Sequence, residues 1–125
     1  MRDDVLDAHP DLDIRVLAIW VPVIKTDNRE AAVRATSVLD DPRVTQFYDP
    51  RLRTSRWFKS NVVDKIKRLG SKRVFGSGIT WDAFFLYGAN ATWNQRPKSH
   101  LTAGATVVAE FDRLTTEIEK LADAR

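Results

Sequence analysis

The sequence contains no cysteine in its 125 residues. Disulfides, thiolate metal ligands and thiol–disulfide exchange are therefore excluded for this chain, because each of them requires a thiol. Histidine is almost as scarce, since His9 and His100 are the only two and lack the spacing of zinc ligands. We find no phosphate loop, nucleophile elbow or dinucleotide fingerprint. The sequence therefore predicts no catalytic residue, no bound metal and no cofactor, and we expect the protein not to be an enzyme.

Long hydrophobic runs are also missing. The longest apolar stretches, residues 16–21 and 83–87, are far too short to cross a bilayer. The polar residues Met1 to Asp4 lack the apolar core of a signal peptide. We therefore expect a cytoplasmic protein with no membrane partner. Hydrophobic residues make up 43% of the chain and aromatic residues 10%, which is enough to build the core of a single domain spanning residues 1–125.

Positive charge is concentrated in one segment. Residues 1–50 carry 6 basic and 10 acidic side chains, residues 51–73 carry 9 and 1, and residues 74–125 carry 5 and 6. The middle segment therefore has a net charge of +8, and Trp57 and Phe58 lie within it. Cations interleaved with aromatic rings are typical of nucleic-acid sites, so these side chains are candidate contacts for an anion or a nucleic acid. They are Arg51, Arg53, Arg56, Lys59, Lys65, Lys67, Arg68, Lys72 and Arg73. The other interpretation is a solvated basic face of an amphipathic helix, and we favour it.

Four tryptophans are many for a chain of this length. Trp20 and Trp81 fall in predicted strands, where core positions are favoured. Trp93 stands beside polar residues on a predicted edge strand, so exposure stays open for it. Large aromatic side chains are enriched at interfaces and in ligand pockets. Core or partial burial is still the favoured interpretation of each tryptophan.

Periodicity and turn residues predict alternating helices and strands. We expect a helix over residues 2–9 and a strand buried on both faces over the nearly all-apolar residues 14–21. A helix capped by Asp27 is expected to run to about Leu39 and to bury Ala31, Ala35 and Val38 or their neighbours. A strand over 44–48 is followed by a helix from Thr54 or Ser55 to Gly70. Residues 81–87 and 91–95 form a hairpin, and residues 105–122 form the last helix. The expected order is α-β-α-β-α-β-β-α, an α/β fold whose mixed sheet has flanking helices.

This order, with three landmarks, resembles the thioredoxin-like superfamily, in the versions with an extra strand and helix before the final β-β-α. The landmarks are a helix ending in His9-Pro10, a strand running into Pro22, and the segment from Val44 to Pro50. The resemblance implies a redox-inactive or N-terminally truncated member, which lacks the first strand and the Cys-x-x-Cys motif. The place of the family's cis-proline reads Ser-Gly-Ile-Thr at residues 77–80. The family's redox activity is therefore not expected here.

The resemblance also implies a gap in the sheet. In the family the missing strand lies between the strands that match residues 14–21 and 81–87, so either these neighbours pair directly or another chain fills the place. An uncovered strand edge favours association. The last predicted helix repeats apolar residues at 4-3-4-3 spacing, a second candidate dimer contact: Val107, Phe111, Leu114, Ile118 and Leu121.

We therefore expect a homodimer that acts as a non-catalytic binding or interaction domain. The alternative is a basic nucleic-acid-binding protein that uses residues 51–73.

Overall fold

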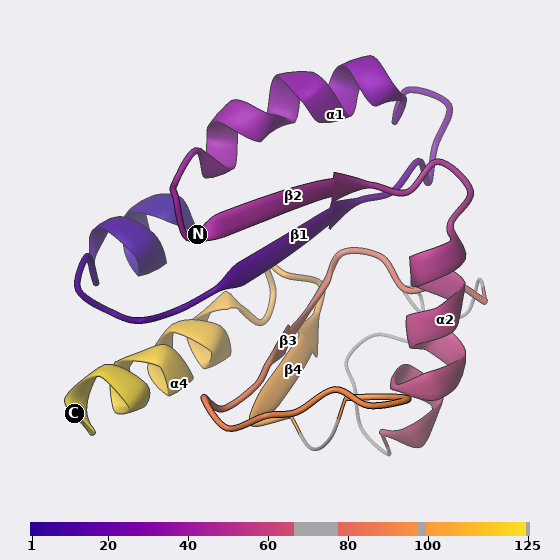
Figure 1. Cartoon of the computed structure of the whole chain (residues 1–125). Helices are drawn as coiled ribbons and strands as arrows, with labels where there is room; N and C mark the ends of the chain where they lie inside the picture. Colours follow the sequence, from indigo (N-terminus) through magenta and orange to yellow (C-terminus); the bar gives the residue numbers. More distant parts are fainter. Residues whose placement is uncertain (67–77, 98–99, 125) are drawn as a thin grey trace. The chain divides into compact units, whose positions relative to one another are not determined.

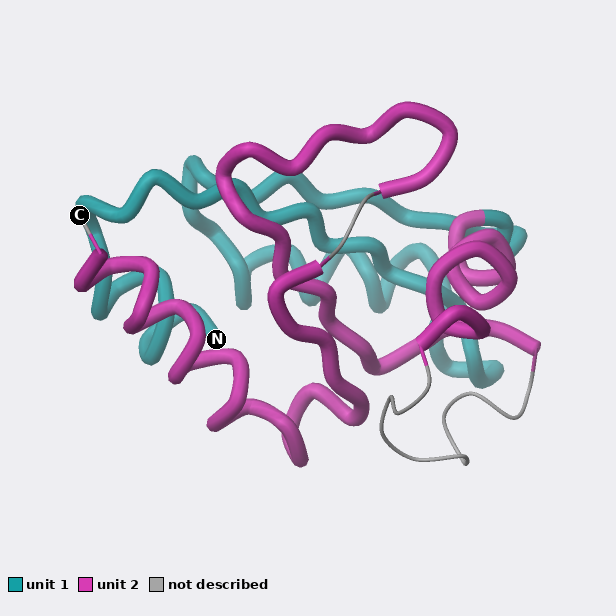
Figure 2. Tube along the Cα trace, turned by 90° about the horizontal axis from the view of Figure 1, so that it is seen from below, with its two compact units in different colours: residues 1–53 teal, residues 54–125 magenta. Residues whose placement is uncertain are grey.

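The computed structural model describes residues 1–66, 78–97 and 100–124. The chain forms two compact units, residues 1–53 and residues 54–125, which Figure 2 shows in different colours. Each unit is described by itself below. That the whole chain is a single domain stays a prediction.

Unit 1 is built around two parallel strands and the helix that connects them. Its elements are the π-helix η1 (Arg2–Asp7), strand β1 (Val16–Trp20), helix α1 (Arg29–Ala35), the 3-10 helix η2 (Thr36–Leu39) and strand β2 (Val44–Tyr48). Val16 lies opposite Val44, and Trp20 lies opposite Tyr48. Helix α1 covers one face of this pair of strands (Figure 1). The strand predicted over residues 44–48 is confirmed, and the one predicted over 14–21 is shorter than expected.

Two neighbouring side chains, Asp27 and Asn28, form different hydrogen bonds at the start of α1. Asn28 is the N-cap, because its Oδ1 accepts a hydrogen bond of 2.9 Å from the Ala31 N–H. Asp27 was predicted to be the cap. Its Oδ2 instead accepts from the backbone N–H groups of Val23 and Ile24, at 3.2 and 3.0 Å. The carboxylate therefore closes the turn between β1 and the helix.

The α1 helix ends earlier than its sequence pattern predicts. The hydroxyl groups of Thr36 and Ser37 donate to the carbonyls of Val33 and Arg34, at 2.7 and 3.2 Å. Such side-chain bonds compete with the regular helical pattern, and the chain tightens into η2. Val38 is 62% exposed, whereas its neighbour Leu39 is half-buried and Ala32 is buried, so the buried side of the helix is formed partly by neighbours of the residues that the pattern names.

Unit 2 contains an antiparallel pair of strands and the last helix. Helix α2 (Arg53–Asn61), which begins at the last residue of unit 1, leads to the 3-10 helix η3 (Val63–Lys65), strands β3 (Ala83–Leu86) and β4 (Thr102–Ala105), and helix α4 (Phe111–Asp123). Strand β3 pairs with β4, so the predicted hairpin partner, residues 91–95, is wrong. In that region the structure has an isolated bridge between Trp93 and Pro97. The last helix begins at Phe111, not at Ala105, because residues 102–105 form β4.

The side chains of β4 are small because the strand lies against large neighbours. A Cβ atom placed on Gly104 would lie 2.8 Å from Cε1 of Phe84 and 2.6 Å from the Glu110 Cβ. Ala103 and Ala105 are buried on either side of it. Helix α4 packs against β4, and its Arg113 Nη1 donates to the Ala103 carbonyl at 3.2 Å. An Ala-Gly-Ala strand carries no β-branched signal, which is why the sequence did not predict it.

Helix α2 is shorter than the predicted helix that ends at Gly70. It stops at Asn61, whose side-chain Nδ2 donates to the Trp57 carbonyl at 2.9 Å. Near its start, the buried Ser55 donates its hydroxyl proton to the Thr80 carbonyl, and the Thr80 N–H returns a bond of 3.1 Å to the Ser55 carbonyl. The predicted end of the helix, including Leu69 and Gly70, lies outside the described residues.

The described residues thus form a mixed α/β structure with one parallel and one antiparallel two-stranded sheet. Counting η1 as the first helix, the main elements within the described ranges follow one another in the order α-β-α-β-α-β-β-α, although the last strand is residues 102–105 and not the predicted 91–95.

Candidate functional sites

The face of the β1–β2 pair opposite α1 is exposed and carries three large apolar side chains beside Thr45. Leu17, Ile19 and Phe47 are 60%, 38% and 50% exposed, and we call them the outer sheet face. Ile19 and Phe47 lie directly opposite each other on the two strands. The prediction of a strand buried on both faces is therefore wrong. The reason is that α1 covers only the face formed by the alternate residues of the strands.

Strand β1 also has an open edge. The Val16 N–H donates to the Arg43 carbonyl, which precedes β2, at 2.9 Å. Because successive N–H groups of a strand point to opposite edges, those of Leu17 and Ile19 point away from β2. Among the described residues, none pairs with that edge of β1.

The predicted basic contacts are spread over several elements of the structure. Arg51 precedes α2, while Arg53, Arg56 and Lys59 belong to α2, and Lys65 ends η3. Lys59 forms an ion pair with Asp64. The remaining four, Lys67, Arg68, Lys72 and Arg73, lie outside the described residues. The described part of the chain therefore shows a basic helix α2, and it leaves the role of the whole segment untested.

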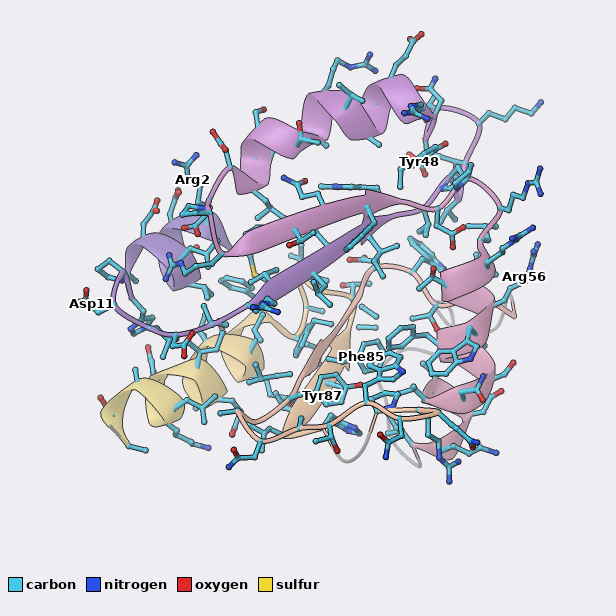
Figure 3. The ribbon with its side chains drawn as sticks, viewed as in Figure 1. Arg2, Asp11, Tyr48, Arg56, Phe85 and Tyr87 are labelled. Carbon is cyan, nitrogen blue, oxygen red and sulfur yellow. The ribbon has the colours of Figure 1, made fainter. Side chains whose placement is uncertain are left out.

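An aromatic cluster lies beside the basic residues of α2. Trp93 stacks on Trp57 with ring centroids 5.4 Å apart and an angle of 23° between the rings. Phe58 meets both tryptophans edge-on and also contacts Phe85, at 5.3 Å between ring centroids. Trp93 is 53% exposed, so the burial favoured for it is wrong and the alternative, exposure, is observed. Figure 3 labels Phe85 in this cluster and Arg56 on α2.

A hollow of about 230 Å³ lies in unit 1, where β1 and β2 end beneath α1. The sequence did not predict it. Residues of both strand ends, of the turn before α1 and of α1 itself line the hollow: Trp20, Val21, Asp27, Asn28, Ala31, Ala32, Ala35 and Tyr48. The Trp20 indole N–H donates to Oε1 of Gln46 at 3.0 Å, and the Gln46 amide donates to the carbonyls of Thr36 and Leu39 at 2.9 and 3.3 Å. These bonds fix one wall of the hollow.

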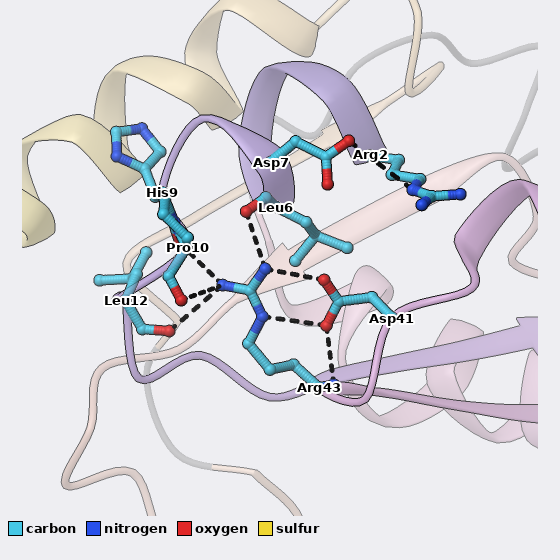
Figure 4. Close-up of polar contacts among 8 residues, drawn as sticks. All are labelled: Arg2, Leu6, Asp7, His9, Pro10, Leu12, Asp41 and Arg43. Carbon is cyan, nitrogen blue, oxygen red and sulfur yellow. Dashed lines mark hydrogen bonds and ion pairs between the residues drawn. The ribbon is translucent and has the colours of Figure 1, made fainter.

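Arg43 ties the start of unit 1 to the start of β2 (Figure 4). Its guanidinium donates to the carbonyls of Leu6 and His9, each at 2.7 Å. It also forms a two-pronged pair with Asp41, at 2.9 Å from Nε to Oδ1 and 2.8 Å from Nη2 to Oδ2. Hydrogen bonds from the Arg43 side chain and then from its backbone N–H lower the pKa of Asp41 to about 2. The sequence pattern did not predict this role of Arg43.

The predicted dimer seam lies largely inside the folded chain. Leu114 and Ile118 are 3% and 1% exposed, and they belong to α4. Phe111 and Leu121 are half-buried. Val107 lies in the turn before α4, where its N–H donates to Oδ1 of Asp82 at 3.1 Å. The most buried of these side chains have no exposed surface to offer a partner, and the dimer itself stays a prediction.

Tyr87 and His100 meet at the end of the β3–β4 pair, with ring centroids 6.5 Å apart. Burial raises the pKa of the Tyr87 hydroxyl above its ordinary value.

Within the described ranges, no group of three or more His, Asp or Glu side chains is arranged to hold a metal ion. In the same ranges, no helix combines the length and the apolar character needed to cross a bilayer. Comparisons with protein-family models, curated proteins and solved structures found no match to this chain.

Proposed function

We propose that the chain is a non-catalytic binding domain with a thioredoxin-like arrangement, whose partner completes the sheet of unit 1. The order of its helices and strands supports the arrangement. The lack of cysteine supports the absence of redox chemistry, because thiol–disulfide exchange proceeds through a thiolate. An insulin-reduction assay with dithiothreitol should match the buffer blank, and a clear acceleration would contradict the proposal.

The outer sheet face is the observation that carries the binding function. Parallel strands with continuous apolar sequences are usually buried on both faces, and β1 has such a sequence. In unit 1, however, Leu17, Ile19 and Phe47 remain exposed next to the open edge of β1. A two-stranded sheet is marginally stable on its own, and an unpaired edge is a template for a further strand. Both features favour a partner that adds a strand to β1 and covers apolar surface.

The partner that we favour is a second copy of the chain. Strand β1 can pair with the same strand of another copy across a two-fold axis, because such an interface uses one surface twice. The Leu17 and Ile19 side chains of both copies would then extend one apolar face. In this proposal the homodimer forms through unit 1, and the apolar residues of α4 pack within their own chain.

A matched pair of variants tests this interface. Leu17 and Val33 are 60% and 61% exposed, but Leu17 lies on β1 and Val33 on α1. Leu17→Lys should convert the dimer into a folded monomer, because the two copies would bring like charges onto neighbouring strands of the joined sheet. Val33→Lys should leave the dimer unchanged. Sedimentation equilibrium, with circular dichroism to check folding, separates the two. A wild-type chain that is monomeric at high micromolar concentration would overturn the dimer.

A second candidate function is weak binding of single-stranded nucleic acid by helix α2 and Trp93. Trp93 presents an exposed ring that Trp57 supports from behind, a suitable platform for a base. Arg53 lies four residues before Trp57 on α2, so the two side chains share a face of the helix. This arrangement places a phosphate-binding cation near the platform.

Fluorescence anisotropy with labelled oligothymidine tests this second function. Trp93→Ala should weaken binding about tenfold, since base stacking on an aromatic ring contributes roughly 1–3 kcal/mol. Leu101→Ala is a suitable control, because Leu101 is 49% exposed and is not part of the aromatic cluster. Affinity should fall steeply between low and physiological salt and should show no sequence preference. Equal binding by wild type and Trp93→Ala would remove this candidate.

A further inference from the structure

The hollow of unit 1 lies at a place where ligands are often bound in α/β proteins. Trp20 and Tyr48 are the last residues of two parallel strands and lie opposite each other. The carboxyl ends of such strands open onto the crevice that α/β proteins use for ligands. At about 230 Å³ the hollow is smaller than the pockets that hold drug-sized molecules. It suits a chemical group about the size of one side chain.

Small residues on α1 keep this space open. Ala31, Ala32 and Ala35 line it from the helix, opposite the two aromatic residues at the strand ends. The bond from the Trp20 indole to Gln46 holds the aromatic wall in place, and Gln46 is itself anchored to two carbonyls of η2. Figure 3 shows Tyr48 at the end of β2 below α1. The hollow is therefore preorganised, so little ordering is needed when a ligand binds.

The lining has a distinct chemical character. It combines two aromatic residues with one carboxylate, Asp27, and one amide, Asn28, and it includes no basic side chain. The Asp27 carboxylate is held at its place by the N–H groups of Val23 and Ile24. Aromatic rings and a carboxylate both attract a cation, and aromatic surroundings recognise alkylammonium groups well. We infer that this hollow binds the alkylammonium group of a small organic cation.

Choline and its neutral carbon analogue, 3,3-dimethylbutan-1-ol, test this inference on the wild-type chain. They share a shape and differ in charge. In nitrogen–proton correlation spectra, choline should shift the Trp20 indole signal saturably and leave the Trp93 indole signal in place. The neutral alcohol should bind about tenfold more weakly, since it lacks the charge that the carboxylate and the aromatic rings attract. Equal shifts by both compounds, or no shift by choline, would overturn the inference.

Two variants separate a ligand site from a simple packing defect. Asp27→Asn keeps an acceptor oxygen for the Val23 and Ile24 N–H groups, so it should stay folded and bind choline about tenfold more weakly. Asp13→Asn, in the exposed segment before β1, is the matched charge control and should bind like wild type. Ala35→Leu fills the hollow and should abolish the shift of Trp20 in a folded protein. Undiminished choline binding by Asp27→Asn or by Ala35→Leu would contradict the site.

Discussion

Unit 1 and unit 2 each contain a two-stranded sheet, but the two sheets differ in how much of their apolar surface is buried. In unit 2, Ala103 and Ala105 of β4 are 4% and 3% exposed, and α4 packs against this strand. In unit 1, α1 covers one face of the strands, while Leu17 and Phe47 stay at least half exposed on the other. The difference indicates that unit 2 uses its sheet for its own stability, whereas unit 1 has apolar sheet surface left for a partner.

The two units also differ in how they are held together. Unit 2 relies on close packing, with Gly104 against the Phe84 ring and four aromatic rings in contact beside α2. Unit 1 relies on a polar clamp, in which Arg43 joins Asp41 to the carbonyls of Leu6 and His9. Unit 2 should therefore be most sensitive to changes of volume, and unit 1 to the loss of these hydrogen bonds.

The largest effect is expected from a single methyl group in unit 2. Gly104→Ala would place a Cβ atom less than 3 Å from the Phe84 ring and from Glu110, so neighbouring groups would have to move. We expect the free energy of unfolding to fall by about 2 kcal/mol, as in other overpacked sites. Gly88→Ala is the matched control, because its nearest neighbours would be the Leu101 methyl groups at 3.9 Å. Urea unfolding of both variants measures the difference, and equal losses would contradict the packing argument.

In unit 1, a smaller loss is expected from the change of Arg43 to lysine. Lysine keeps the charge but cannot make the two-pronged bond to Asp41 together with the bonds to Leu6 and His9. The midpoint of thermal unfolding should fall for Arg43→Lys and should not change for Arg34→Lys, which alters an exposed side chain of α1. Calorimetry of the two variants decides whether the clamp contributes to stability. Identical midpoints would show that it does not.

The smallest effect is the pH dependence of the same clamp. The pKa of Asp41 falls from its ordinary value of 3.8 to about 2 in the folded chain. A depressed carboxyl pKa stabilises the folded state above the unfolded pKa, and this contribution is lost as the pH falls towards the folded value. Stability of the wild type should therefore decline between about pH 4 and pH 2. Asp41→Asn should show a shallower decline in urea titrations over this range, and an unchanged slope would contradict the assignment.

Much of the fold could be predicted from the sequence because its signals are local. The strand over 44–48 and the order of elements follow from apolar patterns and turn residues. Strand β4 could not be predicted, since Ala-Gly-Ala has no strand propensity and is specified by its packing against Phe84. The helical spacing that begins at Val107 suggested a longer last helix, but the first of these residues belongs to a turn.

The candidate sites were harder to predict because they join distant residues. Arg43 donates to the carbonyls of His9 and Leu6, which lie 34 and 37 positions away in the sequence. No local sequence pattern near Arg43 predicts these contacts. The hollow depends on three alanines that looked like ordinary helix residues until Trp20 and Tyr48 were placed opposite them. For Trp93 burial was the favoured interpretation and its polar neighbours only left exposure open, yet the side chain is 53% exposed.

The most direct test of the proposed partner is hydrogen exchange at the backbone of β1, followed by nuclear magnetic resonance at two protein concentrations. The N–H groups of Val16, Ala18 and Trp20 point towards β2, and those of Leu17 and Ile19 point to the open edge. If a second copy adds its strand there, Leu17 and Ile19 become protected as the concentration rises, while Val16, Ala18 and Trp20 are protected throughout. Fast exchange of Leu17 and Ile19 at every concentration would contradict the account, and so would protection that does not depend on concentration.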